Sequence, residues 1–147
     1  MPRIPFAFSL FIALLFLSLL TACRNDKAPA AAEMAVDDDF AIFYERFHTD
    51  SLYQLEHITF PLEGLPSNAT DVDIDFRWEE GNWKLHKPID PETSGFHSEF
   101  TRLGDIVIER IVHENGQYGM MRRFAKLNDG EWYLIYYVGL NPLSTPG

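Results

Sequence analysis

Three stretches of different hydrophobic pattern divide the chain. Phe6 to Leu20 is apolar apart from two serines, the next residues up to 36 are small or polar, and apolar residues then recur at helix and strand spacings. An apolar run of 15 residues is typical of an export signal (~7–15) and short for a spanning helix, which needs ~18 or more. We therefore predict a signal peptide at 1–22, a flexible tether at 23–36, a folded domain at 37–141 and a tail at 142–147.

The folded part begins with a helical pattern. Acids at 37–39 suit the start of a helix, and an aromatic stripe follows at i, i+3, i+4 and i+7: Phe40, Phe43, Tyr44 and Phe47. This spacing predicts a helix of about three turns that buries one face, with His48 on the polar face. We interpret the stripe as core and not as a cofactor box. A second short helix is expected at 51–57, burying Leu52 and Leu55.

The middle of the chain predicts short strands. Residues 58–62 form an extended segment, and residues 71–78 alternate apolar and polar side chains, as a half-buried strand does. The acids in that alternation begin like a calcium loop, but Phe76 replaces the glycine that such a loop requires, so we favour a solvated face. A return strand is expected around Trp83 and Leu85, and residues 89–103 read as irregular.

The strongest strand pattern lies near the C-terminus. Three long strands are predicted at 105–113, 118–127 and 131–140. They are joined by Asn115-Gly116 and Asp129-Gly130, dipeptides preferred in tight hairpins. Helices followed by these strands predict an α+β fold with a mainly antiparallel sheet.

Two stretches of the chain resemble known families. Leu20-Thr21-Ala22-Cys23 resembles the lipobox of bacterial lipoproteins, which implies that Cys23 becomes the mature N-terminus and carries acyl chains on its sulfur and amine. The block from Phe124 to Leu134 resembles a hairpin of NTF2-like domains, and the run from Phe40 to Leu62 is similar to the DUF4348 lipoproteins of the Bacteroidetes. This likeness implies an NTF2-like cone in which a curved sheet wraps N-terminal helices. A buried cysteine and an uncleaved membrane anchor are the alternatives for the N-terminal stretch.

Composition narrows the choice of partners. The chain has 147 residues with 12 Lys and Arg against 22 Asp and Glu, and loss of Arg3 with the signal leaves 11 − 22 = −11. This acidity argues against nucleic acid and against electrostatic binding to anionic lipid. With a single cysteine there is no disulfide within the chain. The lipid bilayer would be reached through acylated Cys23 alone, and two or more acyl chains make that attachment stable.

Candidate chemistry centres on one hairpin. Pairing across a two-residue Asp129-Gly130 turn places Arg122 opposite Tyr137 and Arg123 opposite Tyr136, on opposite faces of the sheet. One arginine must then point inward. Its partner is an internal acid, such as Glu45 or Glu56, or an anionic ligand, and we favour the internal acid.

No metal, cofactor or catalytic motif stands out in the sequence, and none of the five histidines is assigned to catalysis. We therefore predict a lipid-anchored envelope protein of the outer membrane, facing the periplasm or the cell surface, that acts as a ligand-binding or protein-interaction module. A proton-transfer isomerase or dehydratase is the first alternative, and a structural envelope component is the second.

Overall fold

The computed structural model describes residues 38–73 and 75–143. Its contacts divide the chain into units 1–32 and 33–147, and all the described residues belong to the second unit. The predicted signal, the tether and Cys23 therefore lie outside the described residues.

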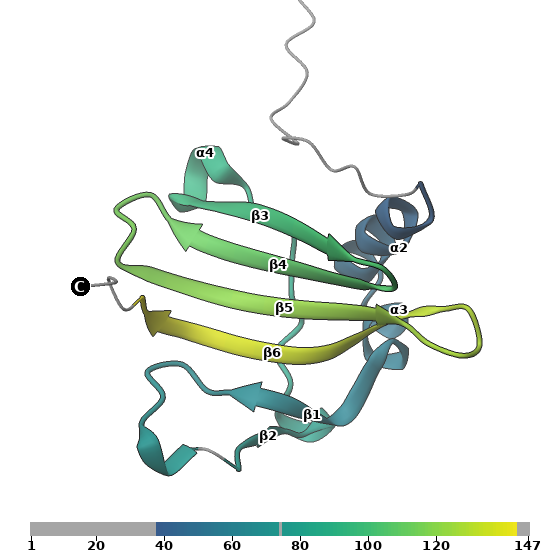
Figure 1. Ribbon diagram of the computed structural model, residues 1–147, viewed down its shortest axis with the longest axis horizontal. Helices are drawn as coiled ribbons and strands as arrows, with labels where there is room; N and C mark the ends of the chain where they lie inside the picture. The colour runs from purple at the N-terminus through teal and green to yellow at the C-terminus, as the bar shows by residue number, and fades with distance from the viewer. Residues whose placement is uncertain (1–37, 74, 144–147) are drawn as a thin grey trace, which may run out of the picture. The chain divides into compact units, whose positions relative to one another are not determined.

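The second unit combines helices with one six-stranded sheet (Figure 1). Its helical elements are α2 (Asp38–Thr49), α3 (Ser51–Glu56), η1 (Asp71–Asp73), η2 (Glu80–Asn82) and α4 (Pro91–Ser94). Its strands are β1 (Ile58–Leu65), β2 (Arg77–Trp78), β3 (Phe96–Leu103), β4 (Ile106–His113), β5 (Tyr118–Lys126) and β6 (Trp132–Pro142). The arrangement confirms the predicted α+β fold, in which N-terminal helices pack on a curved, mainly antiparallel sheet.

The sheet order is β2-β1-β6-β5-β4-β3. All neighbouring strands are antiparallel except β1 and β6, which are parallel. Between β2 and β3 the chain crosses from one edge of the sheet to the other. Pro61 lies where the pairing of β1 with β6 shifts register, between Ile58 and Glu63. A proline has no backbone N–H to give to a ladder, so an irregular position suits it.

The aromatic stripe of α2 forms the core, as predicted. Phe40, Phe43 and Phe47 are at most 4% exposed. Their rings meet Phe124 of β5 at centroid distances of 5.5 to 5.7 Å, each close to edge-on. Aromatic pairs favour this geometry. Trp132 belongs to the same cluster, and its ring centroid lies 4.9 Å from that of Phe40.

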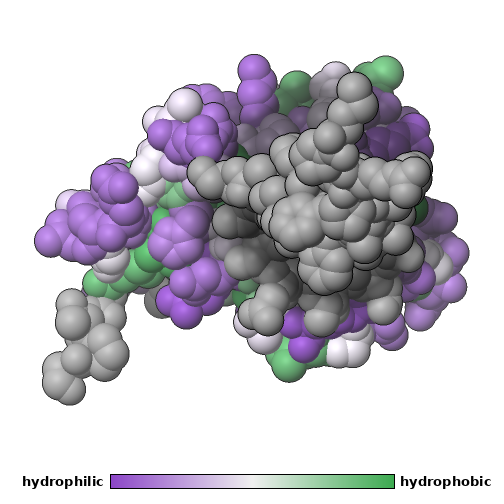
Figure 2. Space-filling model, turned by 90° about the horizontal axis from the view of Figure 1, so that it is seen from above, coloured by the Kyte–Doolittle hydropathy of each residue, from purple (hydrophilic) through white to green (hydrophobic). Residues whose placement is uncertain are grey.

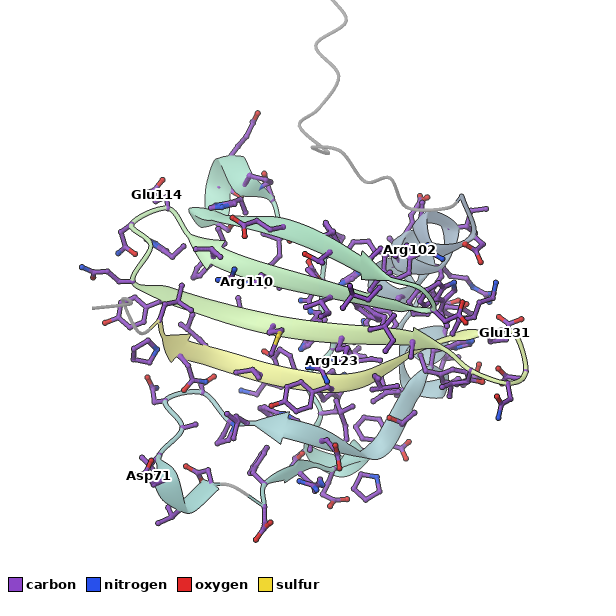
Figure 3. All side chains as sticks on the ribbon, in the orientation of Figure 1. Asp71, Arg102, Arg110, Glu114, Arg123 and Glu131 are labelled. Carbon is purple, nitrogen blue, oxygen red and sulfur yellow. The ribbon has the colours of Figure 1, made fainter. Side chains whose placement is uncertain are left out.

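The two sides of the sheet differ in what covers them. The covered face, which carries Val107, Glu109 and Phe124, packs against α2 and α3 behind the sheet in Figure 1. The opposite face, here called the open face, carries Arg123 and looks toward the viewer in Figure 3. Residues 83–90, here called the crossing segment, also run behind the sheet toward α4 (Figure 1).

The middle of the chain departs from the sequence prediction. Residues 71–73 form the turn η1 instead of a strand, and only Arg77–Trp78 is extended. Asp73 explains the difference, because its carboxylate accepts hydrogen bonds from the backbone N–H and the hydroxyl of Thr70. Such local bonds compete with strand pairing. The predicted return strand at Trp83 and Leu85 is also absent, since residues 83–90 have no regular structure.

The segment predicted to be irregular contains a strand. Residues 89–103 form α4 and then β3, which pairs with β4 along its whole length. Its burial alternates half-buried and exposed. The polar content of this edge strand concealed the alternation, because only Phe96 and Phe100 are large and apolar among its inward positions.

In the view from above, the surface not covered by grey atoms is mostly hydrophilic (Figure 2).

The C-terminal strands are confirmed, but their turns are longer than predicted. Leu127 and Glu131 are joined by a backbone hydrogen bond, so the β5–β6 turn has three residues and ends at Gly130 with φ 84°. A turn of this length commonly has its last residue in the left-handed region. Ile135 then bulges out of the pairing, and beyond it Arg122 faces Tyr137 as predicted. Residues 114–117 make the β4–β5 turn, also longer than two residues.

Candidate functional site

Arg122 is the arginine that points inward. It lies on the covered face between Glu109 of β4 and Tyr137 of β6, with a relative exposure of 3%. Arg123 lies on the open face, where its guanidinium carbon is 5.0 Å from the centre of the Tyr136 ring. The structure therefore separates the four predicted ligand residues into two pairs on opposite faces of the sheet.

Arg122 is paired within the protein, but with an acid other than the two predicted from the sequence. Its Nη1 lies 3.1 Å from Oε2 of Glu109, and both side chains are buried. Glu45 and Glu56, the predicted partners, are exposed. The expectation of a helix acid was wrong because Glu109 lies directly opposite Arg122 on the neighbouring strand.

Glu109 is the centre of a buried polar cluster, defined here as Tyr44, His48, Ser98, Glu109 and Arg122. Its Oε1 accepts hydrogen bonds from the Tyr44 hydroxyl at 2.7 Å and the Ser98 hydroxyl at 2.6 Å. Its Oε2 accepts from Arg122. Removing a carboxylate from water costs several kcal/mol, which only such a set of donors can offset. Both oxygens are therefore engaged as acceptors.

His48 was predicted to lie on the polar face of α2, but it is buried in the same cluster. Its Nδ1 lies 2.8 Å from the Tyr44 carbonyl oxygen, so Nδ1 carries the proton. Nε2 then accepts from Nη1 of Arg122 at 2.9 Å. Burial, and after it the charge of Arg122, lowers the pKa of His48 to about 4. The imidazole is thus neutral at neutral pH.

Tyr44 also keeps a single protonation state. Burial, together with the negative charge of Glu109, raises its pKa far above the ordinary value of 10. The phenol therefore remains a hydrogen-bond donor to Glu109. Three of the five members of the cluster are thus fixed as neutral donors or acceptors: Tyr44, His48 and Ser98.

One donor in the cluster lacks a partner. Nη1 of Arg122 makes two hydrogen bonds, whereas its Nε is buried and has no hydrogen-bond partner among residues 38–73 and 75–143. An unsatisfied buried donor costs about 1–3 kcal/mol. An incoming acceptor at this atom would remove that cost.

His86 of the crossing segment adjoins Arg122. Burial, and after it the positive charge of Arg122, lowers the pKa of His86 to about 2, so the imidazole is neutral. Its Nδ1 is also buried without a partner in the described part of the chain. Its ring lies 4.5 Å from those of Trp83 and Tyr137. Within residues 38–73 and 75–143, the Tyr137 hydroxyl donates only to the sulfur of Met120, at 3.8 Å, which is a weak acceptor.

Gln54 of α3 holds the crossing segment in place. Its amide nitrogen donates to the carbonyl oxygens of Phe47 and His86, and its amide oxygen accepts from the His86 N–H and the Trp83 indole. Gln54 is 1% exposed, whereas Leu52, predicted to be buried, is 72% exposed. The helix turns its amide inward because four backbone and side-chain groups there need partners.

Part of this site was visible in the sequence. Val107, Glu109 and Ile111 occupy alternate inward positions of β4, so an acid interrupts an apolar series. That interruption marks a buried carboxylate. Nothing in the sequence indicates that His86 returns to the same place, because it lies in a segment without periodic pattern.

Metal binding and membrane crossing are two further features that bear on function. Within residues 38–73 and 75–143, no group of three or more His, Cys, Asp or Glu is placed to hold a metal ion. In the same part of the chain, no helix has the length and apolarity to cross a membrane.

Comparison with solved structures places the fold. A cystatin-like protein from Bacteroides caccae ATCC 43185 matches with a TM-score of 0.53 and 22% identity, over 68% of this chain and 74% of that chain. This likeness shows a shared fold and says nothing of activity. No family model and no curated protein matches the chain.

Two further matches are weaker. An NTF2-like protein from Bacteroides fragilis NCTC 9343 has a TM-score of 0.47 and 18% identity, over 77% of this chain and 50% of that chain. A protein from Bacteroides ovatus ATCC 8483, solved by NMR, has a TM-score of 0.48 and 24% identity, over 66% of this chain and 70% of that one. The likeness to the DUF4348 lipoproteins stays a prediction.

Proposed function

We propose that this protein is a membrane-tethered binding module that holds a small polar ligand on the covered face of its sheet. The observation that carries the proposal is the buried Nε of Arg122, which lacks an acceptor within the described residues. Buried polar groups in proteins are nearly always paired. An unpaired donor on a residue that lies opposite Tyr137 in the sheet supports a ligand that supplies the acceptor.

The ligand enters by displacing the crossing segment. Nε of Arg122 and Nδ1 of His86 are both buried, so a bound molecule needs space that His86 now fills. The crossing segment has no regular structure, and the hydrogen bonds described for His86 all go to Gln54. Trp83 of the segment also packs on aromatic rings, but a segment without strand pairing opens at lower cost than a paired strand.

Binding fits the cluster better than proton transfer does. A general acid or base works best when its pKa is near the operating pH. The pKa of His48 is lowered to about 4, that of His86 to about 2, and that of Tyr44 is raised. Glu109 has both oxygens occupied by donors. The cluster therefore supports a fixed set of polar contacts and not an isomerase or dehydratase site.

The membrane part of the proposal rests on Leu20 to Cys23. We place the protein in the cell envelope, anchored by acylated Cys23 to the outer membrane and facing the periplasm or the cell surface. As a flexible coil, the predicted tether after Cys23 would span roughly 20 Å on average. A tether of this length would leave the domain free to meet a soluble ligand.

The test is a thermal-shift screen of the full-length protein in detergent against envelope metabolites. A ligand should raise the melting temperature of the wild type and quench or shift the fluorescence of Trp83, whose ring contacts His86. Arg122→Lys keeps the charge beside Glu109 but loses Nε, so it should abolish the shift. The control is Arg110→Lys on β4, whose side chain is 57% exposed. The proposal fails if no compound binds, or if both variants respond alike.

A further inference from the structure

The buried polar cluster has no net charge. Arg122 contributes one positive charge and Glu109 one negative charge, at 3.1 Å from each other. The pKa of His48 is about 4 and that of His86 about 2, so both imidazoles are neutral at neutral pH. The charge of the arginine is thus already compensated before any ligand arrives.

What the site lacks is a hydrogen-bond acceptor. Nε of Arg122 is a donor without a partner among the described residues, and the Tyr137 hydroxyl has only the Met120 sulfur. Nδ1 of His86 also lacks a partner there, and a neutral imidazole nitrogen is either a donor or an acceptor. A carbonyl oxygen satisfies the first group, and an amide can satisfy the last through its N–H or its oxygen, according to which nitrogen of His86 carries the proton.

We infer that this site binds an uncharged ligand that presents an amide or similar carbonyl group to Nε of Arg122, and that Glu109 excludes carboxylates. The inference rests on the proposed function and specifies its ligand class. A carboxylate would add a second negative charge next to a carboxylate that is 0% exposed. An uncompensated buried charge is costly, whereas a neutral amide adds none. The anionic ligand considered from the sequence is therefore disfavoured.

Isosteric pairs of small molecules test this selection. Acetamide with acetate, and propionamide with propionate, differ in charge but hardly in shape. Binding of each to the full-length protein in detergent is measured at neutral pH by saturation-transfer NMR, with titration to obtain Kd. We expect each amide to bind at least about tenfold more tightly than its carboxylate, equivalent to about 1.4 kcal/mol.

Two variants assign the selection to Glu109. Glu109→Gln keeps the shape and the acceptor oxygen but leaves Arg122 with an uncompensated positive charge, so it should reverse the preference toward the carboxylates. Glu99→Gln, on the exposed side of β3 with a side-chain exposure of 53%, should leave the preference unchanged. If Glu109→Gln does not fold, as judged by circular dichroism, the wild-type preference decides alone.

The outcomes separate the inference from the proposed function. Equal or tighter binding of the carboxylates by the wild type overturns the inference, and so does an unchanged preference in folded Glu109→Gln. Failure of all four compounds to bind also overturns it. The proposed function survives each of these results when another class of compound raises the melting temperature in an Arg122-dependent manner.

Discussion

Nη1 of Arg122 is shared between two groups from different parts of the chain, Oε2 of Glu109 and Nε2 of His48. The pairing with Glu109 brings two opposite charges into a place where their side chains are 4% and 0% exposed. Because neither charge reaches water, each depends on the other. This dependence gives the site its clearest mutational signature.

Replacing Arg122 by Met should destabilise the protein by about 3–5 kcal/mol, since Glu109 is left as an unpaired buried charge. Arg123→Met is the matched control and should cost no more than about 2 kcal/mol, because Arg123 is half-buried beside Tyr136 and has no buried acid as a partner among the described residues. The double variant Arg122→Met/Glu109→Met should recover part of the loss. Urea unfolding of all four proteins measures these differences. Equal costs for the two single variants would contradict the assignment of inward and outward arginines.

Acid should weaken the fold through His48 and His86. Their pKa values in the folded protein are about 4 and about 2, below the ordinary 6.5, because burial and the charge of Arg122 disfavour the charged form. The unfolded chain therefore takes up protons first as the pH falls below 6.5. The contribution of these two histidines to stability is then constant above this value and decreases down to about pH 4, by about 1.4 kcal/mol per pH unit for each histidine.

A single variant tests this slope. His48→Gln keeps an acceptor for Arg122 but cannot titrate, so the slope of stability between about pH 6.5 and about pH 4 should fall to about half. Carboxyl groups with a lowered pKa, such as Asp39 and Asp50, start from 3.8 and act mainly below this window. Denaturant unfolding at intervals of pH gives the slopes. A variant with the wild-type slope would show that His48 is not buried as a neutral group.

Phe43→Ala should cost about 3–5 kcal/mol, because the ring is buried and its loss leaves a cavity among other aromatic side chains. The neighbouring residue provides the control. Ile42 is 68% exposed, so Ile42→Ala should change the stability by no more than about 0.5 kcal/mol. Thermal or urea unfolding distinguishes the two. Similar costs would show that the helix packs with another face inward.

Gln54→Ala should release the crossing segment. The four groups that contact its amide would lose a partner, and each unsatisfied buried group costs about 1–3 kcal/mol. We expect the His86 amide hydrogen to exchange faster and the Trp83 fluorescence to move to longer wavelength as water reaches the ring. Leu52→Ala, at an exposed position of the same helix, should do neither. Unchanged exchange in Gln54→Ala would mean that other contacts hold the segment.

Cys23→Ser tests the membrane anchor. We expect the precursor to remain uncleaved and to incorporate no labelled fatty acid, because the oxygen cannot replace the thiol in the acylated product. Ser18→Ala, within the apolar run, should be processed normally. A Cys23→Ser protein that is cleaved and released in soluble form would argue for an ordinary secretory signal.

The elements that the sequence predicted well are those whose partners lie close along the chain. Helix α2 has four aromatic residues at one spacing, and the strands β4 to β6 follow one another through short turns. Local pattern and local pairing agree in these regions. Strand β3 was missed because its inward positions include Ser98 and Arg102, which are polar but contact residues of the covered face.

The site was predicted only in part for a similar reason. Strand alternation alone places Arg122 and Arg123 on opposite faces, so that relationship could be derived without a structure. The identity of the partner could not, because Glu109 and His48 come from elements whose distance from Arg122 depends on how the helix packs on the sheet. His86 was beyond prediction, since hydrogen bonds to Gln54 of α3 and aromatic packing on distant elements determine where its segment lies.

Because of the bulge at Ile135, the length of the hairpin can change by one residue without a change in the geometry of the site. A two-residue turn with regular pairing and a three-residue turn with one bulged residue contain the same number of residues between Arg122 and Tyr137. Deletion of Ile135 would therefore leave Arg122 opposite Tyr137, because the flanking pairs on both sides of the bulge already fit a continuous ladder. The hairpin can thus gain or lose one residue during evolution while the buried polar cluster keeps its position.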